Sequence, residues 1–176
     1  MIKKSDTILS EALIEKALIS KENLDHCLKE VDSSGQSLIQ VLVKSGELSE
    51  RDVLTIMAEK LKLTYLDLKR ISIEKSVLDK IPVKIASYYR FLPISIKNRV
   101  LTIAVFAPLD IKTQDEIRTQ VGYDIEMALS CQDEILESLK KYYGVGADTL
   151  ERIVSDRKST RLNSSHSAKS RMPSSA

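Results

Sequence analysis

The sequence predicts an α+β protein: an all-α tandem helical-pair module, then a small α+β domain with a three-stranded sheet, then a disordered C-terminal tail. Three observations support this fold class. Apolar positions repeat after 29 residues near the N-terminus, short alternating segments replace the helical pattern after Leu61, and serine and basic residues dominate from Ser155. The expected divisions are the module at 1–62, a connector at 63–76, the α+β domain at 77–145, the start of a linker at 146–154 and the tail at 155–176.

In the N-terminal repeat, each of six apolar or small residues of the first copy corresponds to an apolar or small residue 29 positions later in the second copy. Each copy has the spacing of two short helices with a tight turn between them. Self-similarity of this kind indicates one supersecondary unit used twice, because neither copy alone can bury its hydrophobic face. The paired sets are Leu9, Leu13, Ile14, Ala17, Leu24 and Leu28, and Leu38, Leu42, Val43, Gly46, Val53 and Met57.

Serines are predicted to begin the second helix of each copy. The Ser20 hydroxyl can accept from an unpaired backbone N–H of the first turn. Ser49 repeats this arrangement, and Asp52 three residues later predicts a capping box. Gly46 is predicted to end the preceding helix in a left-handed conformation. A loop at 32–35 is expected to separate the copies.

The second half alternates short strands with helices. Residues 63–68 are expected to be extended, and a polar connector follows. Pro82 places a break near the middle of a predicted helix, since proline disfavours helix at the residue before it. The remaining expected elements are a helix at 76–88, a hairpin of strands 91–96 and 100–105, a helix from Asp110 to Gln120 ended by Gly122, a strand at 124–129 and a helix at 132–143.

The C-terminal tail differs in composition from the rest of the chain. Residues 155–176 contain eight serines, five Lys or Arg and one acid, too little apolar surface to offset the entropy of ordering. The stretch 157–166 also resembles translated sequencing-adapter read-through, so we exclude the tail from the fold. Without it the net charge changes from +2 to −2, since 22 basic and 24 acidic residues remain. A mildly acidic body gives no electrostatic reason to expect nucleic-acid binding.

The sequence shows no grouping of residues that is typical of a catalytic site or a metal site. None of the five glycines belongs to a phosphate-binding Gly-x4-Gly-Lys loop, and no nucleophile and base pair is evident. Cys27 and Cys131 lack CxxC spacing, and His26 has no second ligand pair at a usable spacing. No apolar run approaches the length of a bilayer span, and the first residues are expected to lead into an amphipathic helix rather than to form a signal peptide. We expect a cytoplasmic protein that is not an enzyme and holds no cofactor or metal.

The order of these elements resembles the N-terminal region of type II secretion and type IV pilus assembly ATPases, over about residues 8–145. The resemblance implies that the region docks to a partner at the inner membrane and that a catalytic domain follows it. The motifs that support it are Leu63-Thr-Tyr-Leu-Asp-Leu68, Ile81-Pro82, Phe91-Leu-Pro93, Leu101-Thr-Ile-Ala-Val105, Ala107-Pro-Leu-Asp110, Gly122 and Tyr142-Tyr-Gly144.

The helical module also resembles the MshEN type, in which each copy opens Arg-Leu-Gly, closes on Gln and contributes to binding cyclic di-GMP. Here the structural leucines are present, whereas other residues stand at the positions that face the nucleotide. Loss of two arginine contacts would remove about 3–6 kcal/mol of binding energy. We therefore expect no binding of cyclic di-GMP. The degenerate positions are Ile8, Ser10 and Val31 in the first copy and Ser37, Ile39, Gly46 and Lys60 in the second.

The resemblance and the missing constellations together predict a regulatory and protein-interaction region of a secretion or pilus motor, without its ATPase domain. The expected partner is the cytoplasmic region of an inner-membrane assembly protein, through which the chain would be recruited to the membrane without inserting. Tyr88, Tyr89 and Arg90 are the candidate contacts, because aromatic residues and arginine favour the centres of interfaces. Two alternatives remain open: a cyclic-di-GMP sensor, and a free-standing adaptor that carries the same module.

Overall fold

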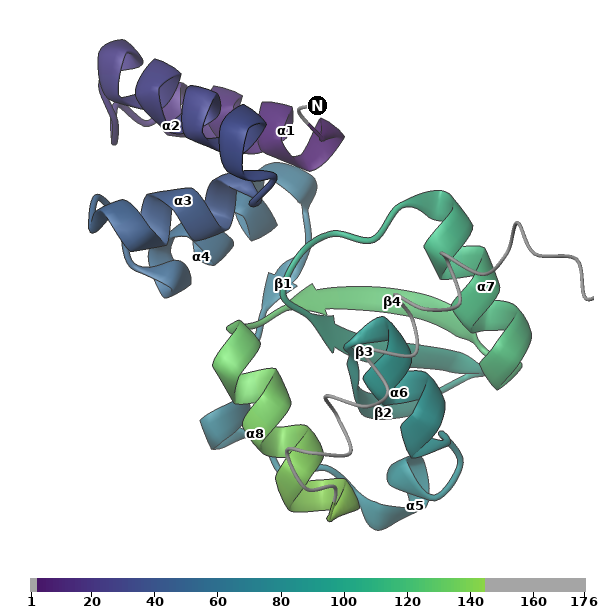
Figure 1. The fold of residues 1–176 in the computed structure, drawn as a ribbon. Helices are drawn as coiled ribbons and strands as arrows, with labels where there is room; N and C mark the ends of the chain where they lie inside the picture. Colours follow the sequence, from purple (N-terminus) through teal and green to yellow (C-terminus); the bar gives the residue numbers. More distant parts are fainter. Residues whose placement is uncertain (1–2, 145–176) are drawn as a thin grey trace, which may run out of the picture.

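The fold is described from a computed structural model, which places residues 3–144 (Figure 1). Two parts follow one another along the chain, a helical repeat and an α+β domain, as the sequence predicts. The expected linker at 146–154 and the expected tail at 155–176 lie outside the described residues.

The helical repeat consists of four helices, two from each copy. They are α1 (Lys4–Glu15), α2 (Lys21–Ser34), α3 (Leu38–Ser45) and α4 (Glu50–Leu61). Helix α1 packs against α4, and α2 packs against α3, so each copy buries its apolar face against the other. Leu9 and Leu13 of the first copy, and Leu38 and Leu42 of the second, are fully buried.

The predicted helix ends are observed, with two corrections. The Ser20 hydroxyl accepts from Asn23 N at 3.2 Å, and Gly46 has the left-handed φ of 76°. Ser49 caps α4 as predicted, because its hydroxyl accepts from Asp52 N at 3.2 Å. The capping box is incomplete, since the Asp52 carboxylate accepts from the Ser49 hydroxyl, at 2.5 Å, rather than from the Ser49 N–H. The expected loop at 32–35 is also too long, since α2 continues to Ser34 and only Gly35 turns left-handed.

The α+β domain has one sheet with helices packed against it. Its elements are β1 (Thr64–Tyr65), the short 3-10 helix η1 (Leu68–Arg70), α5 (Lys75–Leu78), α6 (Val83–Tyr89), β2 (Leu92–Lys97), β3 (Val100–Val105), α7 (Ile111–Val121), β4 (Asp124–Leu129) and α8 (Gln132–Tyr143). The strand order is β1-β4-β3-β2. Strands β2 and β3 form the predicted antiparallel hairpin, and β4 runs parallel to β3. Helix α7 packs against β4, and α8 packs against β2 and β3.

The sheet has four strands rather than the three expected. Thr64 and Tyr65 pair in parallel with Ala128 and Leu129, which adds the short strand β1 at the edge. The expected helix at 76–88 is divided into α5 and α6, because Pro82 stands at the N-terminus of α6. An extended conformation was predicted for residues 63–68, but the pairing of Thr64 and Tyr65 with β4 was not.

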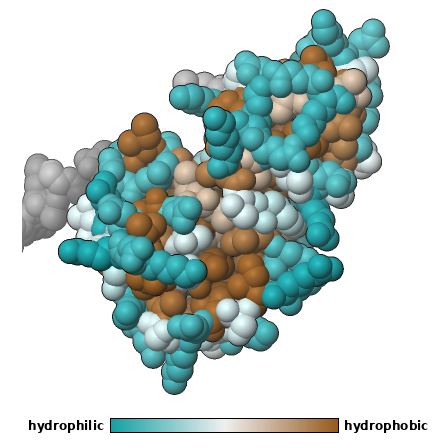
Figure 2. All heavy atoms as spheres, turned by 180° about the vertical axis from the view of Figure 1, so that it is seen from behind, coloured by the Kyte–Doolittle hydropathy of each residue, from teal (hydrophilic) through white to brown (hydrophobic). Residues whose placement is uncertain are grey.

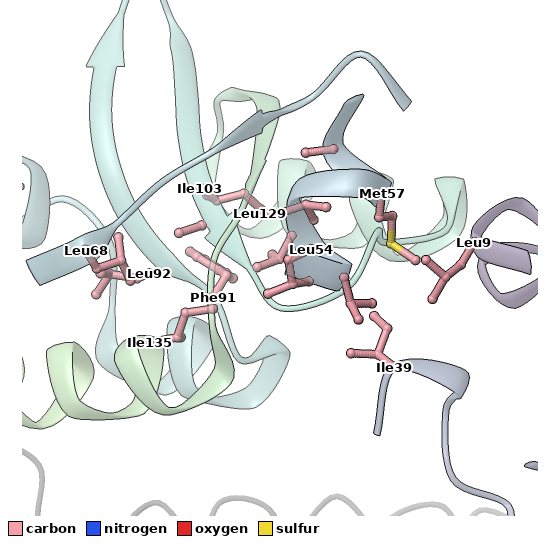
Figure 3. Packing of buried hydrophobic residues seen from close by; sticks show 14 of the residues in the cluster. Leu9, Ile39, Leu54, Met57, Leu68, Phe91, Leu92, Ile103, Leu129 and Ile135 are labelled. Atoms are coloured by element: carbon pink, nitrogen blue, oxygen red, sulfur yellow. The ribbon is translucent and has the colours of Figure 1, made fainter. Parts of the chain in front are cut away.

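The apolar cores of the two parts meet at α4. Leu54 and Met57 of α4 are fully buried, as are Ile103 and Leu129 of the sheet. In Figure 3 the Leu54 side chain lies between the sheet residues and Met57, which in turn lies toward Leu9 of α1. Buried side chains of both parts therefore belong to one hydrophobic cluster.

Candidate functional site

The predicted contact residues lie together at the end of α6. Tyr88 is 36% exposed, and its ring packs edge-on against that of Tyr89, with centroids 4.8 Å apart. The Tyr89 hydroxyl donates to Glu116 Oε2 of α7 at 3.2 Å, which ties α6 to α7. Arg90 ends the helix in a left-handed conformation, with a φ of 54°, and is half-buried. An aromatic pair and a guanidinium are thus presented where α6 stops.

Helix α7 adds an apolar residue that the sequence analysis did not single out. Ile111 is 77% exposed and is the first residue of the helix, directly after the capping residue Asp110. It lines a shallow depression of about 770 Å³ along α7 together with Tyr89, Lys112, Asp115, Glu116, Thr119 and Gln120. We refer to Tyr88, Tyr89, Arg90, Ile111 and Glu116 as the α6–α7 surface. Aromatic, arginine and aliphatic side chains of this kind are typical of protein interfaces.

Apolar surface is also visible elsewhere on the α+β domain. Figure 2 shows brown apolar atoms gathered on the larger body and bordered by teal hydrophilic side chains. Isolated exposed apolar residues are normal on protein surfaces, whereas a contiguous group beside aromatic residues and arginine indicates an interaction site. The α6–α7 surface is distinguished by its combination of an aromatic pair, an arginine and the exposed Ile111.

Most of the degenerate nucleotide positions take part in packing or local structure. Val31 and Ile39 are buried, with 4% and 5% of their surfaces exposed. Ser10 donates to Asp6 O at 2.8 Å, and the Ser37 hydroxyl accepts from Gln40 N at 3.4 Å as the cap of α3. Gly46 supplies a left-handed helix end. Ile8 is half-buried on α1.

The last of these positions, Lys60, is held in an ion pair with Glu15, at 2.7 Å between Lys60 Nζ and Glu15 Oε1. A second pair joins Lys16 of α1 to Glu59 of α4. The two pairs cross the α1–α4 contact in opposite directions. The Lys60 ammonium is therefore already paired with a carboxylate of its own chain.

The junction between the helical repeat and the α+β domain has polar contacts that the sequence analysis missed. Glu50 Oε1 of α4 accepts from Gln132 N at 3.0 Å, which supplies a partner to the first turn of α8. The residue before that helix, Cys131, makes no side-chain capping bond. Arg51 lies 3.8 Å from Asp67 Oδ2 and 5.8 Å from the centre of the Tyr65 ring.

Reactive groups do not converge within the described part of the chain. Between residues 3 and 144 no cluster of His, Cys, Asp and Glu could hold a metal ion. Burial raises the pKa of both Cys27 and Cys131, so their thiols stay protonated and weakly nucleophilic at neutral pH. Burial also raises the pKa of Tyr143 to about 12, and its hydroxyl donates to Ile81 O at 3.0 Å. Among the same residues no helix is long and apolar enough to cross a bilayer.

Comparisons with known proteins support the resemblance noted from the sequence. The MshEN domain model matches residues 61–149. The type IV pilus assembly ATPase PilB of Myxococcus xanthus (strain DK1622) is 26% identical over 148 residues, which are 84% of this chain and 26% of PilB. The chain thus spans about a quarter of the length of this curated relative.

Two solved structures share the fold. The structure of MshE with cdg matches with a TM-score of 0.71 and 26% identity, over 77% of this chain and 98% of that one. The N-terminal domain of XpsE matches with a TM-score of 0.60 and 19% identity, over 80% and 97% of the two chains. The family model lies on the α+β half, whereas the MshEN resemblance was drawn from the helical repeat. The MshE match covers more of the chain than 61–149 and so extends into that repeat.

Proposed function

Because the chain belongs to the MshEN domain family and corresponds to the N-terminal region of type II secretion and type IV pilus assembly ATPases, we propose that it docks such a motor to an inner-membrane platform protein. In this role the chain contributes binding and regulation, and the ATPase chemistry belongs to a separate domain. The partner is the cytoplasmic region of that membrane protein.

The observation that supports docking most directly is the α6–α7 surface. Its exposed members come from two helices that are held together by the hydrogen bond from Tyr89 to Glu116. A rigid platform of this kind loses little conformational entropy on binding. The sheet edge is a weaker candidate, because Pro93 and an irregular register between Pro93 and Ser95 interrupt the edge strand β2.

Co-purification of the whole chain with the membrane assembly protein encoded beside it tests the proposal. Arg90→Glu and Ile111→Glu should each weaken the complex by about tenfold or more, since centrally placed contacts dominate interface energies. Leu18→Glu is the matched control, because Leu18 is also exposed, at 44%, but lies in the helical repeat. Failure of the folded wild-type chain to bind any such protein, or equal losses in all three variants, would contradict the assignment.

Binding of cyclic di-GMP is a second candidate function, favoured by the similarity to MshE, whose structure is described with cdg, the abbreviation of that nucleotide. Against it, Val31 and Ile39 are buried and Lys60 is paired with Glu15. Among these three positions only Lys60 offers a cationic donor, which is already paired, and the buried side chains of Val31 and Ile39 do not provide the close backbone approach that phosphates require. We therefore propose that the chain does not bind the nucleotide.

Isothermal titration calorimetry of the whole chain with cyclic di-GMP provides the test. We expect no saturable heat at high micromolar protein concentration. Saturable binding with a Kd below about 10 μM would contradict the proposal, because about 7 kcal/mol of binding energy would then need another source. In that event Lys60→Ala would show whether the ion-paired lysine exchanges its carboxylate partner for phosphate.

A further inference from the structure

The charges of the α+β domain are unevenly distributed. Residues 69–84 contain five Lys or Arg and two acids, and the last turn of α8 adds Lys140 and Lys141. Residues 3–144 contain 21 basic and 22 acidic residues in total, so the part of this range outside these segments has a net negative charge. The seven basic residues define what we refer to as the basic face: Lys69, Arg70, Lys75, Lys80, Lys84, Lys140 and Lys141.

Hydrogen bonds hold these segments side by side. The Tyr142 hydroxyl lies 3.4 Å from Ile71 O and 3.4 Å from Ile73 N, and the Tyr143 hydroxyl lies 3.0 Å from Ile81 O. The last turn of α8 is therefore fixed against the chain on either side of α5. Figure 1 shows α5 and this end of α8 together at the end of the molecule that is remote from the helical repeat.

Most of these cations have no ionic partner among the described residues. Lys75, Lys80, Lys84 and Lys140 are exposed and form no ion pair within residues 3–144. Arg70 pairs with Asp67 at 3.5 Å. Lys141 lies 5.3 Å from the centre of the Tyr142 ring.

Four carboxylates stand close to the basic face, and two of them, Glu134 and Glu137, line a depression together with Lys69 and Lys141. Glu74 and Asp79 flank α5, and Glu137 lies one turn before Lys141 on α8. They reduce the local charge without cancelling it, because the seven cations and these four carboxylates together sum to +3. In the helical repeat, by contrast, Lys16, Lys44 and Lys60 are each paired with a glutamate.

We propose that the basic face lies against the surface of a bilayer rich in anionic lipids, as a peripheral contact separate from the docking of the α6–α7 surface. Six of the seven cations are lysines, which bind as flexible point charges and suit a diffuse anionic surface better than a shaped phosphate site. Nucleic acid fits less well, since the neighbouring Tyr142 and Tyr143 rings are half-buried with their hydroxyls bonded to backbone carbonyls.

Flotation of the whole chain with vesicles tests this inference. The vesicles are made of phosphatidylcholine, with and without phosphatidylglycerol, and contain no protein, so the result is independent of the docking experiment. The wild-type chain should bind only the anionic vesicles and should be released by high salt. The triple variant Lys75→Glu, Lys80→Glu, Lys84→Glu should bind about a hundredfold more weakly, since each basic residue near the surface contributes about a fivefold gain in partitioning.

The matched control is the triple variant Lys4→Glu, Lys21→Glu, Lys29→Glu, which changes the net charge by the same amount but in the helical repeat. The residues after 144 are unchanged in both triple variants. The control should retain most of the binding. Both variants should stay folded by circular dichroism, because glutamate is favourable in the first turn of a helix. Lys75 and Lys84 of the test variant lie in such turns, as do Lys4 and Lys21 of the control. The milder set Lys75→Gln, Lys80→Gln, Lys84→Gln should change binding in the same direction.

Three outcomes would overturn the inference. One is absence of wild-type binding to anionic vesicles at low salt. Another is an equal loss in the two triple variants, which would assign binding to net charge or to residues after 144. The third is binding to duplex DNA of random sequence without binding to vesicles, which would identify a nucleic-acid surface instead.

Discussion

Ala17 adopts a left-handed backbone conformation, with a φ of 52°, at the place where the second copy of the repeat has Gly46 with a φ of 76°. Side chains with a Cβ are strained in this region by about 1 kcal/mol, whereas glycine is not. We therefore expect Ala17→Gly to raise the free energy of unfolding by about 0.5–1 kcal/mol in urea denaturation. Gly46→Ala should lower it by a similar amount.

Ala12→Gly is the matched control for this prediction, because Ala12 is also in the first copy but lies inside α1 and is 2% exposed. Glycine there should destabilise the chain by about 1 kcal/mol, through backbone entropy and loss of a buried methyl group. A decrease in stability for Ala17→Gly as well would show that the left-handed conformation of Ala17 is not strained.

Asp110 is predicted to make stability depend on pH. Its Oδ1 accepts from Thr113 N at 2.7 Å at the start of α7, and the backbone hydrogen bond to Thr113 lowers its pKa. Because the folded-state pKa lies below the unfolded value of about 3.9, the stabilisation is present above that value and is lost as pH falls through the folded-state pKa. Asp110→Asn keeps a capping oxygen but cannot ionise. The difference in Tm between wild type and variant should therefore shrink from about pH 7 to about pH 3; a constant difference would contradict this.

At the scale of elements, the hydrogen bond that Gln132 N donates to Glu50 Oε1 joins α8 to α4 across the two parts of the molecule. Glu50→Ala should cost about 1 kcal/mol and should speed amide exchange at Gln132, because the first turn of α8 loses its acceptor. Glu22→Ala provides the comparison, since Glu22 is also an acidic residue in the first turn of a helix, α2, but is not the acceptor of the Gln132 N–H. The exchange at Gln132 should be unchanged in Glu22→Ala. Equal exchange in both variants would contradict a capping role for Glu50.

Elements defined by local signals could be predicted, and those defined by distant partners could not. Helix α8 begins and ends where its apolar spacing and Gly144 predict. Strand β1 was missed because it is two residues long and depends on pairing with Ala128 and Leu129. The division between α5 and α6 follows from Pro82, although the predicted helix ran across it.

The candidate contact residues follow the same distinction. Tyr88, Tyr89 and Arg90 could be selected by residue type, since aromatic residues and arginine are enriched at interfaces. Ile111 could not be selected by residue type, because an isoleucine in an amphipathic helix is usually buried. A usable signal was its place at the start of a helix, immediately after the capping residue Asp110. Glu50 gave no sequence signal, because its partner is a backbone N–H that lies 82 residues away.

At the scale of the molecule, the two parts should unfold as one cooperative unit. The buried cluster is continuous from Leu9 through Met57 and Leu54 to Leu129, and the Glu50 bond and the Arg51–Asp67 ion pair cross the same junction. Parts that share a core lose their stability together, because exposing one also exposes the apolar surface of the other. A local defect in the helical repeat should therefore destabilise the sheet as well.

The distribution of tyrosines makes this prediction measurable. All six tyrosines lie between residues 65 and 143 and the chain has no tryptophan, so tyrosine fluorescence reports on the α+β domain alone. Leu42→Ala removes a fully buried side chain from the helical repeat and should cost about 2–5 kcal/mol. The midpoints from tyrosine fluorescence and from far-ultraviolet circular dichroism should shift equally, whereas Val43→Ala, at a site that is 37% exposed, should move neither by much. A tyrosine transition that stays at the wild-type midpoint in Leu42→Ala would show that the two parts unfold independently, and the junction at α4 would then be a contact between separate domains.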